Sequence, residues 1–193
     1  NSRLAAARSY LRYASDGSPS LTSVWLASCK VPTLSTPKRQ RPVIAAGDLA
    51  AFLDAPEPTR IGNRDRFILV LLFDTAIRAA ELVGVTLGDL VMPGGAASSI
   101  LVHGKGRRER RIGLSDGADR HLRAYLAAYH EGQREPSTPL VYTAIHGKKH
   151  AMSERNVECI VAKYGDIARE THPDIPKTHP HMVRRTRATT LYR

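Results

Sequence analysis

The chain has 193 residues, of which 29 are lysine or arginine and 18 are aspartate or glutamate, so its formal net charge at pH 7 is +11. A surplus of this size favours a polyanionic partner, nucleic acid first, because neutralising phosphates releases counterions; a basic protein of unrelated function is the alternative. The length allows one domain with its own core and a small appendage. The absence of an eighteen-residue apolar run and of a signal peptide argues against membrane insertion and secretion.

The first 46 residues are predicted to precede the main domain. Arg3 to Ala14 is predicted to form a short basic helix, because its apolar residues fall on one helix face. Residues 32–46 are predicted to be an extended linker, since prolines recur in its first part. The positive charge of this linker suits a strap along a phosphate backbone, and a solvated tether is an equally good interpretation of its composition. The linker cations are Lys38, Arg39 and Arg41.

From residue 47 onward the pattern predicts a mainly α domain with a small antiparallel β-sheet, an α+β fold class. Asp48 is predicted to cap a helix that runs to Ala55. Arg64 to Arg78 is strongly apolar and is predicted to form a long buried helix, and Ser153 is predicted to cap a later one. The other expected elements are strands at 99–103, 108–114 and 140–142, and helices at 116–130, 153–170 and from 178 onward.

Arg78 and Glu81 are the first candidate functional pair. Arg78 is the last residue of the predicted apolar helix, and Glu81 lies one turn further on. Because a buried guanidinium is unfavourable unless an anion meets it, Arg78 is a candidate for binding an anionic ligand. The competing interpretation is an Arg78–Glu81 ion pair with a purely structural role.

Lys105 is the second candidate, because it lies between Gly104 and Gly106 at the predicted tip of a hairpin. A lysine at such a tip can move its ammonium group into a DNA groove or an active site. A solvated run of charge is the ordinary alternative. The same hairpin carries further candidates for DNA binding, which are Arg107, Arg108 and Arg110.

His181 and Arg184 form the third candidate group, an H-x-x-R pattern on the predicted last helix. Residues at positions i and i+3 lie on one helix face, so the imidazole and the guanidinium can converge on one anionic group. The pattern is short, and taken alone it occurs often by chance.

Together and in this order, the three segments resemble the tyrosine recombinases, also called the phage integrase family. Residues 62–89 resemble the first arginine box of the family, with Ala76 where a glycine is more usual. Residues 102–114 resemble its catalytic-lysine hairpin. Residues 179–191 resemble its H-x-x-R box, with Arg185 where a second histidine is common.

The resemblance implies a domain organisation. Segments 3–14 and 37–42 are similar to the last helix of the family's N-terminal DNA-clamping domain and to the linker after it. Residues 1–31 would then end a core-binding domain, 32–46 would be a basic linker, and 47–193 would be a catalytic domain that is incomplete at its C-terminus. The resemblance further implies double-stranded DNA as partner, protomers that assemble as a tetramer on DNA, no cofactor or metal, and a location in the bacterial cytoplasm.

The resemblance also implies phosphoryl transfer through a 3′-phosphotyrosyl intermediate. Arg78 and Arg184 would offer forks of donors to the nonbridging phosphate oxygens, where negative charge must be stabilised. Lys105 would give a proton to the leaving 5′-oxygen, and His181 would assist proton transfer or hydrogen-bond the phosphate. Glu81 would hold Arg78 or His181 in place.

The family places its attacking tyrosine beyond the H-x-x-R helix, after more helical structure. Tyr192 is the one tyrosine that follows Arg184, and it lies on the same expected helix, so we expect this chain to hold no nucleophile and to cleave no DNA. A catalytically inactive DNA-binding regulator is therefore the alternative to an active site-specific recombinase or integrase. A type IB topoisomerase uses a similar residue set, but the close match of the first arginine box argues against it.

Overall fold

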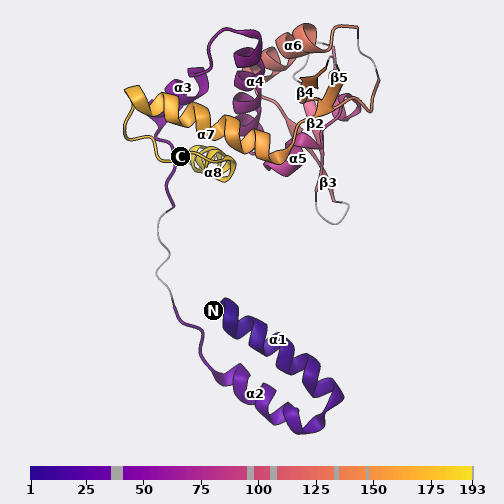
Figure 1. The fold of residues 1–193 in the computed structure, drawn as a ribbon, viewed down its shortest axis with the longest axis vertical. Coiled ribbons are helices and arrows are strands. Elements are labelled where there is room, and N and C mark those ends of the chain that lie inside the picture. Colours follow the sequence, from indigo (N-terminus) through magenta and orange to yellow (C-terminus); the bar gives the residue numbers. More distant parts are fainter. Residues whose placement is uncertain (36–40, 95–97, 105–107, 133–134, 147, 193) are drawn as a thin grey trace. The chain divides into compact units, whose positions relative to one another are not determined.

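The computed structural model describes residues 1–193 apart from 36–40, 95–97, 105–107, 133–134, 147 and 193. The chain divides into two compact units, Asn1–Arg41 and Pro42–Arg193 (Figure 1). No helix in the described part of the chain is both long enough and apolar enough to cross a membrane. Some of the candidate residues lie outside the described residues, namely Lys38, Arg39, Lys105 and Arg107.

The first unit is a pair of helices without a buried core. Helices α1 (Ser2–Gly17) and α2 (Thr22–Lys30) lie side by side and are joined by a short 3₁₀ helix (Pro19–Leu21). Arg8 links them, because its guanidinium donates to three backbone carbonyl oxygens at the end of α2. None of the described residues of this unit is buried, so hydrogen bonds and partial burial hold the two helices together. The predicted helix at 3–14 is confirmed as part of α1.

The second unit is built around α4 (Arg60–Thr75), whose apolar residues supply much of the core. The other long helices pack around it or against one another, as Figure 1 shows. These are α3 (Ala46–Asp54), α6 (Asp116–Tyr129), α7 (Glu154–Thr171) and α8 (Pro180–Leu191). Phe67 of α4 stacks on Tyr125 of α6 with ring centroids 4.2 Å apart, which adds a directional contact to the burial. The predicted fold class, mainly helical with little sheet, is confirmed.

Two small antiparallel sheets complete the second unit. The first has the order β1 (Leu90–Val91), β2 (Ser99–His103), β3 (Glu109–Gly113), and the second pairs β4 (Tyr142–Ile145) with β5 (Lys148–Ala151). The strand predicted at 99–103 is confirmed, and the strand predicted at 108–114 is confirmed as β3, which is one residue shorter at each end. The strand predicted at 140–142 is wrong in its bounds: residues 140 and 141 are buried in the core and bond to separate backbone segments, and pairing begins at Tyr142.

Two helix starts test the capping predictions. Ser153 accepts a hydrogen bond from the backbone N–H of Asn156, so its predicted cap of α7 is confirmed. Asp48 does not cap α3, whose N-cap is Ala45. Asp48 lies instead in the first turn, where its carboxylate faces the positive end of the helix dipole.

The predicted helix from Arg64 to Arg78 is wrong at both ends. α4 begins at Arg60, because Thr59 caps it by accepting from Gly62 N–H, and it ends at Thr75. Ala76 then adopts the left-handed conformation, with φ 49° and ψ 31°, which turns the chain out of the helix. Arg78 therefore starts a new short helix, α5 (Ala79–Val83), as its N-cap residue.

Replacing Ala76 with glycine should stabilise the protein. A left-handed residue with a Cβ is strained by about 1–2 kcal/mol, and glycine relieves this at a smaller cost in chain entropy, so we expect a net gain of about 0.5–1 kcal/mol. That gain would raise the melting temperature by about 1–4 °C. Thermal unfolding measures it. Ala124→Gly on the exposed face of α6 is the matched control and should change stability by about 1 kcal/mol in the opposite direction; equal losses in both variants would contradict the strain argument.

Candidate functional site

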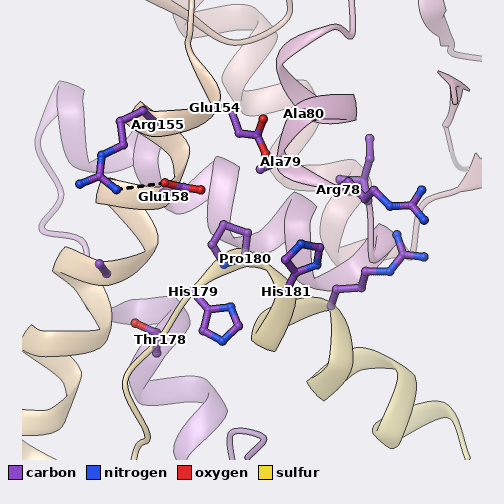
Figure 2. A pocket seen from close by; sticks show the side chains of 13 residues that line it. Arg78, Ala79, Ala80, Glu154, Arg155, Glu158, Thr178, His179, Pro180 and His181 are labelled. Carbon is purple, nitrogen blue, oxygen red and sulfur yellow. Dashed lines mark hydrogen bonds and ion pairs between the residues drawn. The ribbon is translucent and has the colours of Figure 1, made fainter. Parts of the chain in front are cut away.

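The side chains of Arg78, His181 and Arg184 meet at one pocket of about 360 Å³. Arg78 comes from the start of α5, and the other two come from the first turns of α8. Figure 2 shows the Arg78 and His181 side chains at the same pocket. The remaining lining residues come from α5 and the residue before its N-cap, from α7, and from the start of α8 and the segment before it: Ile77, Ala79, Ala80, Glu154, Arg155, Glu158, Ala162, Thr178, His179 and Pro180.

Glu81 holds Arg78 from behind the pocket. The Arg78 backbone N–H donates to Glu81 Oε2 at 3.0 Å, and Arg78 Nη1 donates to Glu81 Oε1 at 2.8 Å. The backbone bond belongs to a capping arrangement at the start of α5, which explains why the two residues are three apart. The Arg78 side chain remains 53% exposed, whereas that of Glu81 is 7% exposed. The structural ion pair is thus present, and it leaves most of Arg78 open to the solvent.

Helix α8 carries His181 and Arg184 on one face because they are three residues apart, while Met182 and Val183 between them are buried in the core. Arg184 Nη1 donates to the carbonyl oxygen of Ala76 at 2.8 Å, so the left-handed turn after α4 also anchors this arginine. Burial, and then the guanidinium groups of Arg78 and Arg110, lower the pKa of Arg184. The guanidinium groups of Arg78, Arg110 and Arg184 therefore lie near one another, with the carboxylate of Glu81 beside them.

The start of α8 is held against α7 by a close backbone approach. A Cβ added to Gly165 of α7 would lie 1.8 Å from Oγ1 of Thr178. Thr178 is buried and donates to the carbonyl oxygen of Val161, also in α7. His179, the N-cap of α8, follows directly and lines the pocket; burial, and then the charge of Arg185 and the neighbouring His181, lower the pKa of His179. Glycine at 165 thus positions the histidine side of the site.

The hairpin of β2 and β3 reaches the site through Arg110. Arg110 Nη2 donates to Glu81 Oε2 at 2.7 Å, and Arg110 Nη1 donates to Glu81 Oε1 at 3.0 Å. Gly104, at the described base of the hairpin tip, lies close to the same pair, since an added Cβ there would be 3.9 Å from Glu81 Oε1. Arg108 and Arg41, the other described candidates for DNA binding, are exposed. Among the candidates for DNA binding, Arg110 thus forms an ion pair with the carboxylate of Glu81.

Comparison with known proteins identifies the group to which this chain is related. The family model described as the phage integrase family matches residues 42–193, which is the whole of the second unit. The chain belongs to the phage integrase family. The resemblance seen in the sequence, that of a tyrosine recombinase catalytic domain, is thereby confirmed.

Individual relatives agree with the family. Tyrosine recombinase XerD of Staphylococcus epidermidis is 30% identical over 172 residues, covering 85% of this chain and 55% of that protein. Tyrosine recombinase XerC of Staphylococcus haemolyticus is 30% identical over 142 residues, covering 74% of this chain and 44% of that protein. The chain therefore spans about half the length of the relatives that it matches.

Solved structures show the same fold. The XerH recombinase bound to difH substrate in a pre-cleavage complex matches with a TM-score of 0.64 at 21% identity, over 82% of this chain and 45% of that one. The XerA recombinase matches with a TM-score of 0.64 at 18% identity, over 90% and 59%. The Tn1549 transposon integrase in complex with circular intermediate DNA matches with a TM-score of 0.61 at 16% identity, over 98% and 72%.

One wall of the pocket was missed by the sequence analysis. Glu154, Arg155 and Glu158, at the start of α7, line the pocket opposite Arg78, and Arg155 Nη1 lies 3.1 Å from Glu158 Oε2 (Figure 2). In the sequence this pair is an ordinary i, i+3 ion pair on a predicted helix, which gives no sign of a site. Only the packing of α7 beside α5 and α8 brings it to the pocket.

The tyrosines of the second unit lie away from the pocket, whose described lining includes none of them. Tyr125, Tyr129, Tyr142 and Tyr164 are buried, and each hydroxyl donates to a carbonyl or carboxylate oxygen. Burial, and then the carboxylate of Asp65, raises the pKa of Tyr164 to about 12, which disfavours a reactive phenolate. Tyr192 follows the last residue of α8 and is 93% exposed.

Proposed function

We propose that this chain is the catalytic-domain part of a site-specific DNA recombinase or integrase, and that Arg78, His181 and Arg184 bind the scissile phosphate. The observation that carries the proposal is the meeting of two arginines and a histidine at one pocket in a chain of this family. Guanidinium forks match phosphate oxygens in geometry and charge. Burial, and then the neighbouring guanidinium groups, lower the pKa of Arg184, and an anion bound beside Arg184 would offset both effects.

The proposed residue roles are those that the family resemblance implies. Arg78 and Arg184 stabilise the charge that develops on the nonbridging oxygens as a tyrosine oxygen attacks phosphorus and the bond to the 5′-oxygen breaks. A proton from Lys105 goes to the departing 5′-oxygen, and the 3′-phosphate stays on the tyrosine. His181 hydrogen-bonds the phosphate or assists proton transfer. Glu81 orients Arg78 and is itself turned away from the ligand.

The attacking tyrosine is none of those described in the second unit. Tyr192 lies eight residues beyond Arg184, which is about 12 Å along a helix at 1.5 Å per residue. An attacking oxygen must come within about 3–3.5 Å of the phosphorus. The helix α8 is continuous from Pro180 to Leu191, so Tyr192 stays out of reach. A DNA-binding regulator that does not cut is the second candidate function.

The partner in this proposal is double-stranded DNA, on which protomers assemble as a tetramer in a bacterial cytoplasm. Residues 1–31 are the end of a core-binding domain, 32–46 are a linker along the DNA backbone, and 47–193 belong to the catalytic domain. Lys38, Arg39 and Arg41 in the linker and Arg107 and Arg108 in the hairpin contact phosphates.

A covalent-adduct assay tests the proposal. The 193-residue chain, incubated with a pool of nicked duplexes, should form no protein–DNA product that survives denaturation, and Tyr192→Phe should change nothing. The same chain extended by any coding sequence downstream of Arg193 should form the product and lose it on Arg184→Gln. An adduct that disappears with Tyr192→Phe would overturn the geometric argument. DNA binding without any adduct from the extended chain would favour the regulator.

A further inference from the structure

Arg110 donates hydrogen bonds to both carboxylate oxygens of Glu81, the residue that also holds Arg78. Its two terminal nitrogens lie 3.0 and 2.7 Å from Glu81 Oε1 and Oε2, which is the bidentate geometry of a strong arginine–carboxylate pair. Each of these oxygens accepts one further bond, one from the backbone and one from the side chain of Arg78. Glu81 thus meets two arginines, one from α5 and one from β3, and neither it nor Arg110 is part of the pocket lining.

This arrangement limits the number of hydrogen bonds that Glu81 can accept from the Arg78 side chain. A carboxylate that is free on both oxygens can bind a guanidinium with two parallel bonds and neutralise its charge. Here Arg110 takes the bidentate position, so the Arg78 side chain gives Glu81 a single bond and keeps its other donors. The cluster of Arg78, Arg110, Arg184 and one carboxylate also keeps a net positive charge, which attracts an anion.

We propose that Arg110 is a positioning residue of the phosphate site: it holds Glu81 so that Arg78 keeps its free donors and its positive charge for the phosphate. The role rests on the proposed function, since it assumes that Arg78 binds phosphate. Arg110 acts through Glu81 and Arg78 and does not touch the phosphate.

The hairpin supplies a matched control for this role. Side chains alternate between the two faces of a strand, so Arg110 faces Glu81 while Arg111, the next residue, is exposed on the other face. Arg110→Gln and Arg111→Gln remove the same charge from neighbouring positions. Only Arg110→Gln removes the guanidinium group that binds both oxygens of Glu81. Arg110→Lys keeps the charge but loses the planar fork.

Inorganic phosphate, titrated into the 193-residue chain at pH 7 and followed by the NMR signals of the Arg78 and Arg184 side chains, measures the site directly. We expect Arg110→Gln to weaken phosphate binding about five- to tenfold, Arg110→Lys about threefold, and Arg111→Gln less than about twofold. In Arg110→Gln the carboxylate is free to neutralise Arg78. Adding Glu81→Gln should therefore restore binding to within about threefold of the parent chain, a rescue that a general loss of stability would not give.

The carboxyl group of Glu81 gives a second readout. Its hydrogen bonds from Arg110 are the main reason why its pKa is lowered to about 2 from an ordinary value of 4.5. The pKa of Glu81, followed by carbon NMR, should rise in Arg110→Gln and stay low in Arg111→Gln.

The possible outcomes distinguish a failure of the phosphate site from a failure of the role given to Arg110. If phosphate moves neither arginine signal in the parent chain and Arg184→Gln has no effect, the phosphate site itself is wrong and the role of Arg110 falls with it. If the parent chain binds phosphate and Arg184→Gln abolishes it, but Arg110→Gln behaves like Arg111→Gln, only the role of Arg110 is overturned. A loss in Arg110→Gln that Glu81→Gln fails to rescue would also overturn it, in favour of a direct contact.

Discussion

Duplex DNA binding by this chain should weaken about 500-fold as monovalent salt rises from about 50 to 200 mM. The proposed phosphate contacts in the linker and the hairpin number five, and each neutralised phosphate contributes roughly 0.9 to the slope of log K against log salt, so a slope of about −4.5 is expected. The net charge of +11 makes such binding favourable at low salt. Filter binding or fluorescence anisotropy across this range measures the slope.

Single substitutions measure how much each residue contributes to the slope of log K against log salt. Arg108 is exposed, and its contribution to the described hairpin base is a backbone carbonyl that accepts from Gly104, so Arg108→Gln leaves that bond in place. It should reduce the magnitude of the slope by about one. Arg120→Gln, on the exposed face of α6 and away from the pocket lining, loses the same charge and should leave the slope unchanged. A flat salt response of the parent chain would remove the electrostatic argument for a DNA partner.

Gly165→Ala should strongly destabilise the second unit. The new methyl group would lie 1.8 Å from Oγ1, 2.5 Å from Cγ2 and 2.6 Å from Cβ of the buried Thr178, and the Cβ atom cannot move away without a shift of the backbone. We expect a loss of about 2–3 kcal/mol in the free energy of unfolding, or about 4–12 °C in melting temperature. The substitution should also displace the pocket residues His179 and His181, because they follow Thr178 in the chain.

The control for this variant is another helical glycine. Gly117 in α6 has open space, the nearest atom to an added Cβ being Ser115 Oγ at 3.9 Å, so Gly117→Ala should be neutral or slightly stabilising. Combining Gly165→Ala with Thr178→Gly removes the obstructing side chain, and the cost of the alanine should then shrink by more than half. A Gly165→Ala chain that unfolds at the parent temperature would show that α7 and the start of α8 separate freely.

Local patterns were enough for part of the fold and of the site. The apolar run of α4, the two strands around Gly104 and the cap at Ser153 follow from periodicity and turn chemistry, which act over a few residues. The three-residue spacing of His181 and Arg184 likewise determines that both lie on one face of any helix that contains them. The family followed from the order of three such local segments.

The tertiary structure decided where those segments meet and what surrounds them. Ala76 adopts a left-handed conformation that its residue type disfavours, and this ends α4 early enough for Arg78 to start α5. Arg110 contacts Glu81, which lies 29 positions earlier in the sequence. Its neighbour Arg111 has the same charge but lies on the opposite face of β3. Composition alone therefore could not distinguish a positioning arginine from a solvated one. Local propensity specifies faces and ends, whereas the partner of a charged side chain depends on the packing of elements far apart in the chain.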